Sequence, residues 1–240
     1  MKKIMITGAT SGIGLELCRQ YLDAGCIVGG CGRNLDKIKE LSAEFPEKLY
    51  IDKIDVSLTA GLAEKLGKLV KRMGGMDICI ISAGISIKNR GFDWQIDEQV
   101  LAVNVMGFAA TAMFCADYFV KQGSGHIAGI SSIAKYFGYY NAAYNASKSF
   151  EDIYLKGMRL RLKNTNVGIT SIIPGFVDTP IISGRDQTFW TADTKKACRQ
   201  IITAIERKKH TAYITRRWRL AAWLLHLLPD RIIRSLVSGR

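Results

Sequence analysis

The stretch Lys3-Ile4-Met5-Ile6-Thr7-Gly8-Ala9-Thr10-Ser11-Gly12-Ile13-Gly14 decides the fold that we expect. Its first five residues form a short apolar run, which is typical of a buried strand. The glycine-rich turn 7–14 follows directly, and apolar residues then recur at helical spacing to about residue 24. A strand, a glycine-rich turn and a helix in this order are the context of a dinucleotide-binding turn, in which amides at a helix N-terminus face a pyrophosphate.

Apolar strands and amphipathic helices alternate along the rest of the chain. We expect further strands near residues 26–31, 49–56, 77–81, 125–132, 167–173 and 211–215, separated by helices near 35–44, 60–73, 95–118, 141–162 and 194–207. Continuous apolar strands that alternate with helices predict a parallel sheet covered on both faces. The expected fold class is therefore α/β: a single doubly wound Rossmann domain of about seven parallel strands over residues 1–215, with a basic amphipathic C-terminal segment over residues 216–240.

The composition favours a single folded domain in a reducing compartment. The 240 residues are 48% hydrophobic and include only four prolines, and no internal repeat or linker interrupts them. Six scattered cysteines form no Cys-x-x-Cys pair, which favours reduced core thiols over disulfides or a metal site. We find no run of about 20 apolar residues that would span a bilayer. The expected location is cytoplasmic. The alternative is a peripheral position on the inner face of a membrane.

A tyrosine and a lysine four residues apart mark the candidate catalytic centre. Tyr144 and Lys148 fall in the expected helix 141–162, where this spacing places both side chains on one face. A phenol is a poor acid or base at neutral pH, but a neighbouring ammonium favours the phenolate and makes proton transfer to a carbonyl feasible. Such pairs also occur by chance on exposed helices, so the interpretation needs support from other motifs.

The end of the second strand bears on the identity of a cofactor. An acidic residue at this point commonly binds the adenosine ribose 2′-hydroxyl of NAD. Here Gly32 and Arg33 follow the strand, and an arginine suits the 2′-phosphate of NADP. The sequence therefore favours NADP(H), and it leaves NAD(H) as the alternative in which Arg33 is an ordinary exposed residue.

Two interior positions of the expected helix 95–118 call for a physical reason. Asn104 is a middling helix former and Gly107 a poor one, yet they fall within one turn. A packing kink is one explanation, and a backbone carbonyl freed to bind water is the other.

With these motifs in place, the chain resembles the short-chain dehydrogenase/reductase family over Lys3 to Thr215. The matching motifs, in order, are Thr7-Gly8-x-x-x-Gly12-x-Gly14, Asp55-Val56, Asn104-x-x-Gly107, Ser132, Tyr144-x-x-x-Lys148 and Pro174-Gly175-x-Val177-x-Thr179. Six ordered motifs are far more specific than any one of them. The resemblance implies cofactor contacts from Gly8, Thr10, Ser11, Gly12, Ile13, Gly14, Arg33, Asp55, Val56, Ser82, Ala83, Gly84, Tyr144, Lys148, Pro174, Gly175, Val177 and Thr179.

The chain departs from the family pattern in two places. Where the family usually has Asn-Asn-Ala-Gly after the fourth strand, this chain has Ile-Ser-Ala-Gly over residues 81–84. The contact that the family's asparagine side chain usually makes is therefore in doubt. The family's usual spacing of thirteen residues to the tyrosine would select Ser131 as the catalytic serine, whereas strand register selects Ser132. We choose Ser132, because register fixes the face to which a side chain points while a loop readily loses one residue.

The resemblance implies hydride transfer between a nicotinamide and a carbonyl or secondary alcohol carbon. Tyr144 would exchange the proton, Lys148 would stabilise the phenolate and bind the nicotinamide ribose, and Ser132 would hydrogen-bond the reacting oxygen. Asn104 would hold a water that links Lys148 to solvent. A small-molecule carbonyl or alcohol substrate and a homodimer or homotetramer are implied as partners, and no metal is needed.

The excess of positive charge lies near the C-terminus. The net charge of the chain is +13. Between residues 195 and 240 there are twelve lysines and arginines but only two acidic residues. The segment 216–229 is cationic, aromatic and apolar, which suits an anionic membrane surface. The alternative is a helix packed over the substrate pocket or against another subunit. Nucleic acid is not expected, because no base-stacking platform or nucleic-acid motif accompanies the charge.

Other functions remain open from the sequence. The stretch Ile181 to Asp193 has no period and resembles a mobile lid, and its apolar residues hint at an apolar substrate. An NAD-linked alcohol dehydrogenase is the alternative among enzymes. Outside enzymes, the alternatives are a sensor that binds NADP without turnover and a membrane-associated scaffold, neither of which would need the four residues Asn104, Ser132, Tyr144 and Lys148.

Overall fold

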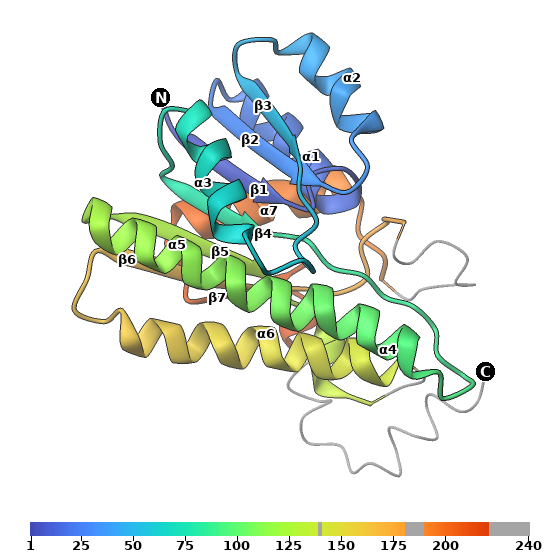
Figure 1. The fold of residues 1–240 in the computed structure, drawn as a ribbon. Coiled ribbons are helices and arrows are strands. Elements are labelled where there is room, and N and C mark those ends of the chain that lie inside the picture. Colours follow the sequence, from blue (N-terminus) through green and yellow to red (C-terminus); the bar gives the residue numbers. More distant parts are fainter. Residues whose placement is uncertain (139–140, 181–189, 221–240) are drawn as a thin grey trace.

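The fold is a seven-stranded parallel sheet between two layers of helices (Figure 1). The computed structural model describes residues 1–138, 141–180 and 190–220. The strand order is β3-β2-β1-β4-β5-β6-β7, and all six neighbouring pairs are parallel. The strands are β1 (Lys3–Thr7), β2 (Ile27–Gly32), β3 (Leu49–Lys53), β4 (Ile78–Ile81), β5 (Gly125–Ile130), β6 (Val167–Pro174) and β7 (Thr211–Ile214). The predicted fold class is confirmed.

Two apolar cores separate the helices from the sheet. One core joins the sheet to α1 (Gly12–Asp23), α2 (Asp36–Glu44) and α7 (Thr194–Glu206). The other joins the opposite face to α3 (Leu62–Arg72), α5 (Phe108–Gln122) and α6 (Ala142–Arg161). Both faces of every central strand are therefore covered, which explains why these strands read as continuous apolar runs.

The strand order fixes where a ligand can bind. The chain builds outward from β1 to β3 on one side and then returns to place β4 on the other side of β1. In open parallel sheets of this kind, a crevice forms outside the carboxyl ends of the strands at the point where the order reverses. The loops after β1, β4, β5 and β6 meet at that crevice.

The helix expected over residues 95–118 forms, but it is longer and irregular. It comprises α4 (Trp94–Leu101), a π-helical segment η1 (Ala102–Gly107) and α5. By length and composition, the whole segment Trp94–Gln122 is apolar enough to cross a membrane, which our reading of the sequence did not anticipate. Half of its most apolar window is buried within this fold, so core packing accounts for its hydropathy.

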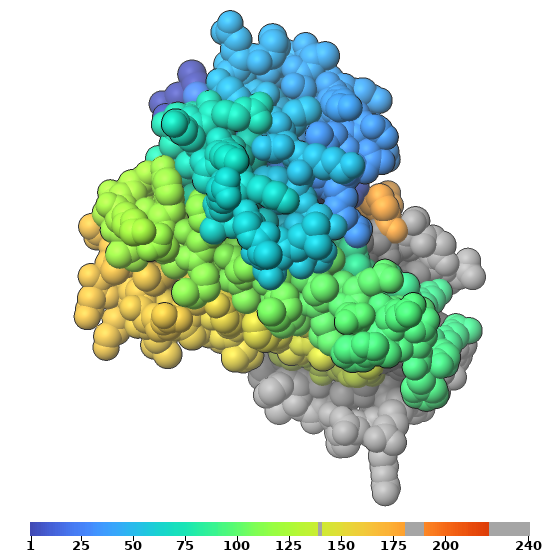
Figure 2. All heavy atoms as spheres, viewed as in Figure 1, coloured from blue at the N-terminus to red at the C-terminus, as the bar shows by residue number. Residues whose placement is uncertain are grey.

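The outer face of the α5 and α6 pair carries exposed apolar side chains. Figure 1 shows the long helix running beside α6, and Figure 2 shows the two as a continuous surface coloured green and yellow. Met106, Ile153 and Leu160 are between 57% and 72% exposed there, and Met113 and Val120 are also exposed. Exposed apolar side chains on neighbouring helices are typical of interaction surfaces.

All six cysteines are free, and five of them are buried. Burial raises the pKa of the Cys18, Cys31 and Cys198 thiols well above their usual range. These thiols are packing residues, as the scattered cysteine pattern predicts. Within the described residues, no group of three or more His, Cys, Asp or Glu side chains is placed to hold a metal ion.

Candidate functional site

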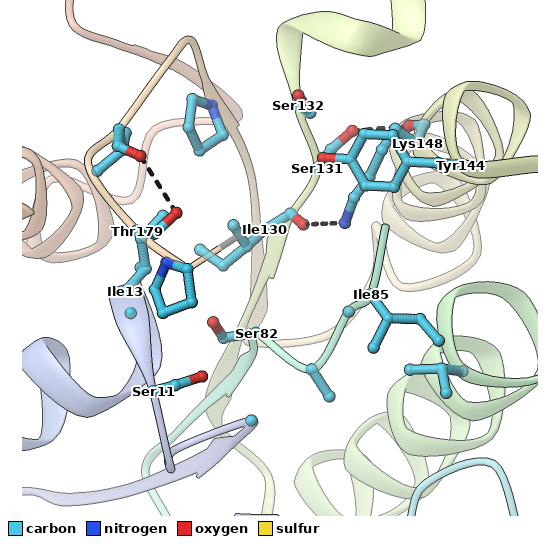
Figure 3. Close-up of a pocket in the computed structure, with 18 of the residues that line it drawn as sticks. Ser11, Ile13, Ser82, Ile85, Ile130, Ser131, Ser132, Tyr144, Lys148 and Thr179 are labelled. Atoms are coloured by element: carbon cyan, nitrogen blue, oxygen red, sulfur yellow. Dashed lines mark hydrogen bonds between the residues drawn. The ribbon is translucent and has the colours of Figure 1, made fainter. Parts of the chain in front are cut away.

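A cavity of about 410 Å³ opens at the carboxyl edge of the sheet, where the order reverses (Figure 3). The loops after β1, β2, β3, β4, β5 and β6 line it together with the first turns of α6. The predicted site residues that line it are Gly8, Thr10, Ser11, Gly12, Ile13, Arg33, Asp55, Val56, Ser82, Ala83, Gly84, Ser132, Tyr144, Lys148, Pro174, Gly175, Val177 and Thr179. Motifs far apart in the sequence thus meet around one cavity.

Two predicted residues, Gly14 and Asn104, lie outside the lining. Gly14 packs beneath the turn: a Cβ there would lie 2.1 Å from the Gly8 carbonyl oxygen. Its part in the motif is therefore close packing of the helix against the turn. Asn104 is fully buried behind the cavity wall and supports it from there.

The turn after β1 is built from glycines because the backbone requires them. Gly8 and Gly12 have positive φ values of 68° and 51°, a region that side chains with a Cβ rarely adopt. A Cβ on Gly8 would also lie 2.6 Å from the backbone of Ala83, which follows β4. Ser11 precedes α1 in an extended conformation without a side-chain cap. The amides of the first turn of α1 therefore face the cavity and fit a pyrophosphate.

Two residues that were expected at the adenosine end lie on neighbouring loops. Arg33 is exposed and makes no ion pair with any described residue. Asp55 accepts hydrogen bonds at Oδ1 from the backbone amide of Ser57, at 3.0 Å, and from its hydroxyl, at 2.7 Å. These bonds orient the carboxylate at the cavity wall.

Tyr144 and Lys148 lie on the face of α6 that meets the cavity (Figure 3). The Lys148 ammonium is 5.7 Å from the centre of the Tyr144 ring. Lys148 is 5% exposed, whereas Tyr144 is half-buried. A buried cation thus lies beside a more accessible tyrosine ring at the cavity wall.

The contacts of Lys148 include a residue that the sequence motifs did not single out. Its ammonium donates to the Ile130 carbonyl oxygen at 3.0 Å and to both carboxylate oxygens of Glu151 at 2.9 Å. Glu151 is completely buried. Burial raises the pKa of the Glu151 carboxyl to about 7, although the Lys148 charge and hydrogen bonds act in the opposite direction.

The two candidate serines have different surroundings. Ser131 is buried, and its hydroxyl donates to the Lys148 backbone carbonyl at 2.7 Å. Ser132 is half-buried, and its Oγ accepts a bond from the Ala134 amide at 3.1 Å. Among the described residues no acceptor is bonded to the Ser132 hydroxyl, so its proton is available to a ligand in the cavity. Both serines line the cavity.

The π-helical segment η1 contains both Asn104 and Gly107, the two poor helix formers. The Asn104 side chain accepts from the Ile85 amide at 2.9 Å and donates to the Ile85 carbonyl and to Ser147 Oγ, each at 3.0 Å. It thus ties the loop after β4 to α6. A Cβ at Gly107 would lie 2.7 Å from the Val56 carbonyl oxygen, so packing explains that glycine. A π-turn disrupts the regular carbonyl ladder, as π-bulges at functional sites do.

An aromatic cluster packs against the loop after β6, and the sequence did not predict it. Trp218 is buried and stacks edge-on against Phe176 and Trp190 at centroid distances of 5.5 and 5.8 Å. A Cβ at Gly175 would lie 2.0 Å from Trp218 Nε1. Trp218 lies in the predicted basic amphipathic segment 216–240, and its side chain is buried against the loop after β6.

Some expected features lie outside the described residues. These are most of the expected lid, residues 181–189, and most of the C-terminal segment, residues 221–240. The last residues of the lid are described, and Ala192 pairs with Val177 beside the cavity. The apolar cavity residues Ile133, Phe137 and Phe176 were not singled out as site residues, although Ile133 and Phe176 lie within or next to predicted motifs.

The chain is similar in sequence to a known protein family and to several known proteins. A family model described as short chain dehydrogenase matches residues 2–189. An uncharacterized oxidoreductase of Mycobacterium tuberculosis is 28% identical over 244 residues, covering 97% of this chain and 96% of that protein. An uncharacterized oxidoreductase of Staphylococcus aureus is 30% identical over 218 residues, covering 87% of this chain and 93% of that protein.

Solved structures share the fold. A closed form of serine dehydrogenase complexed with NADP+ aligns with a TM-score of 0.79 at 24% identity, over 88% of this chain and 93% of that chain. An NADPH-dependent 3-quinuclidinone reductase from Rhodotorula rubra aligns with a TM-score of 0.78 at 22% identity, over 88% of this chain and 89% of that chain. At these identities the likeness establishes the fold.

The close approach of Gly8 to β4 can be tested against a matched glycine. Gly8→Ala and Gly25→Ala both place a Cβ at positive φ, which costs about 1 kcal/mol, but nothing lies within 4 Å of a Cβ at Gly25. We expect Gly8→Ala to lower the free energy of unfolding by at least about 2 kcal/mol more than Gly25→Ala, because it also overpacks against Ala83. Urea denaturation measures both, and equal losses would contradict the packing argument.

Proposed function

The chain belongs to the short chain dehydrogenase family, and we propose that it is an NADP(H)-dependent oxidoreductase acting on the carbonyl or secondary alcohol group of an apolar substrate. The family and the relatives named oxidoreductases make it an NAD(P)-dependent dehydrogenase or reductase. The preference for NADP, the substrate class and the residue roles are proposals. The observation that carries them is the placement of Tyr144 and Lys148 on one face of α6 at the cavity.

Each catalytic role follows from the position of a side chain. When bound, the nicotinamide cofactor supplies or accepts the hydride. Tyr144 gives its phenolic proton to the carbonyl oxygen in reduction, or takes the hydroxyl proton in oxidation. Lys148 stabilises the phenolate through its charge. It holds the nicotinamide ribose by exchanging one of its three bonds, to Ile130 or Glu151, for a ribose hydroxyl. Ser132 donates its hydroxyl proton to the reacting oxygen and so stabilises the negative charge that develops there.

Asn104 acts from behind the cavity wall. Its side chain fixes the loop after β4 against α6, and its backbone lies in the π-helical segment beside Lys148. A carbonyl released from the regular helix ladder can bind water. We propose that this water links Lys148 to solvent.

The cofactor assignment rests on the charge at the end of β2. Arg33 lines the cavity and provides a planar cation that suits a 2′-phosphate, and it has no ion-pair partner among the described residues. Two solved structures of the same fold carry NADP or NADPH in their descriptions, the serine dehydrogenase and the 3-quinuclidinone reductase. A 3-ketoacyl-(acyl-carrier-protein) reductase from Brucella melitensis complexed with NADH shares the fold as well. The proposed preference for NADP(H) over NAD(H) therefore rests on Arg33.

The substrate class rests on the lining beyond Tyr144. Ile85, Ile133, Phe137 and Phe176 give this part of the cavity an apolar wall. Apolar walls with few polar groups are typical of sites for small organic ligands. An apolar carbonyl or alcohol compound fits this wall.

We propose two assembly surfaces. The exposed apolar face of α5 and α6 suits a homodimer or homotetramer. Sedimentation equilibrium would measure the mass of the assembly. The second surface is an open groove of about 840 Å³ along β7 and α7, which is lined by Lys135, Lys156, Lys209, Arg216 and Arg219. A cationic groove beside the C-terminal segment suits an anionic membrane surface.

Tyr144→Phe tests the catalytic role. The variant loses the proton donor but keeps the ring, so we expect turnover of a carbonyl panel, followed by NADPH absorbance, to fall at least about 100-fold. NADPH binding, followed by cofactor fluorescence, should change little. Activity within a few-fold of the parent would refute the assignment.

Arg33→Ala tests the cofactor. Removing a charged hydrogen-bond donor from a phosphate should weaken NADPH binding about tenfold to a hundredfold and leave NADH binding unchanged. Lys39→Ala is the matched control, because Lys39 is an exposed cation of α2 outside the cavity lining. Equal losses for both cofactors would favour the NAD-linked alternative.

Charge reversal in the full chain tests the membrane surface. We expect the parent to co-sediment with anionic vesicles and not with zwitterionic ones, and Arg216→Glu with Arg219→Glu to reduce that binding. The control is the double variant Lys65→Glu with Lys71→Glu, which makes the same charge change on exposed residues of α3. Equal sedimentation of the two double variants would discard this surface.

A further inference from the structure

The catalytic lysine is paired with a carboxylate that is sealed inside the protein. Both carboxylate oxygens of Glu151 lie 2.9 Å from Lys148 Nζ. The Lys148 side chain is 7% exposed and the Glu151 side chain is 0% exposed, so solvent does not screen the pair. The Ile130 carbonyl is the third acceptor around the same ammonium, at 3.0 Å.

Glu151 has no other hydrogen-bond partner among the described residues. The next residue, Asp152, is equally buried but has different partners: Lys135, Lys156 and the Ser171 hydroxyl. Burial raises the pKa of the Asp152 carboxyl, but these three partners outweigh burial and lower it. Adjacent residues on α6 therefore serve separate ion pairs, and the one made by Glu151 is dedicated to Lys148.

Within the part of the chain that the structure describes, the charged groups on the elements packed against α6 have other partners or are exposed. Lys135 of the short 3-10 helix η2 (Ile133–Tyr136) bonds Asp152, and His126 of β5 bonds Thr170. On α4, Asp97 bonds Asn89 and Glu98 is exposed. On α5, Asp117 pairs with Lys121 and Cys115 lies against Cys79. Tyr144 is thus the titratable group that shares Lys148 with Glu151.

We propose that Glu151 is a positioning residue that holds the Lys148 ammonium beside Tyr144 and, as its counter-ion, sets how strongly that ammonium stabilises the Tyr144 phenolate. This inference rests on the proposed function, because it assigns Tyr144 and Lys148 their catalytic roles. The geometry supports both parts: two parallel contacts restrict the ammonium, and an unscreened negative charge offsets its field.

The direction of the effect follows from the charges. Burial raises the pKa of the Glu151 carboxyl to about 7, so above this pH the side chain carries its negative charge next to Lys148. It then opposes formation of a second negative charge nearby. Removing the Glu151 charge should therefore let Tyr144 ionise at lower pH. In the direction of reduction, which needs the protonated phenol, kcat/KM should then begin to fall at lower pH.

The test is a titration of Tyr144 itself, without substrate. Tyrosinate absorbance is followed against pH for the parent and for Glu151→Gln, each as a difference from the same protein carrying Tyr144→Phe. We expect the midpoint of the Tyr144 signal to fall by about one pH unit in Glu151→Gln. Asp117→Asn, which removes an exposed carboxylate from α5, should leave the midpoint unchanged.

Two provisions keep the outcome decisive. If Glu151→Gln does not fold, Glu151→Met carries the same prediction, because an apolar side chain of similar length suits a fully buried position. An unchanged midpoint in the folded variant, or an equal shift in Asp117→Asn, would overturn the proposal. Failure of the carbonyl panel with the parent enzyme would count against the proposed function instead, since the titration needs no turnover.

Discussion

The close passage of the β1 turn against the end of β4 is the constraint on which the site depends. These two strands are neighbours in the sheet although they are far apart in sequence, and their following loops must diverge around a crevice. The backbone of Ala83 lies so close to Gly8 that no side chain fits between them. The cofactor turn, the loop that carries Ser82 and the start of α1 are thereby held as one unit, and the remaining motifs are arranged around it.

The proposed catalytic groups depend on the register of α6. Helical spacing turns Tyr144 and Lys148 toward the cavity and Glu151 toward the interior beneath them. The next residue, Asp152, faces Lys135 and Ser171 instead. A slip of one residue in this helix would turn Tyr144 and Lys148 away from the cavity and move Asp152 away from Lys135 and Ser171. The contacts of Asp152 with these two residues outside α6 therefore support the register.

How far the sequence could predict the molecule differs between local and tertiary features. The strand at Lys3, the glycine turn and the Tyr144–Lys148 spacing are local patterns with fixed geometric meaning, so the fold class and the face of α6 followed from them. The contact of Glu151 with Lys148 is visible as helical spacing, but its energetic weight comes from burial by α5 and the sheet. Trp218 was grouped with a basic tail by composition, whereas the space beside Gly175 determines where its ring lies. The apolar helix 94–122 is likewise long and apolar enough to span a membrane, and only its burial within the fold shows that it is a core helix.

The contact between Gly175 and Trp218 also has an evolutionary consequence. The indole nitrogen occupies the volume that any side chain at position 175 would need. Substitutions at the two positions are therefore coupled: a larger residue at 175 becomes acceptable only after the tryptophan is replaced by something smaller. In a set of related sequences, glycine at the first position and a large ring at the second should be inherited together, and the C-terminal strand end and the loop after β6 should diverge as one module.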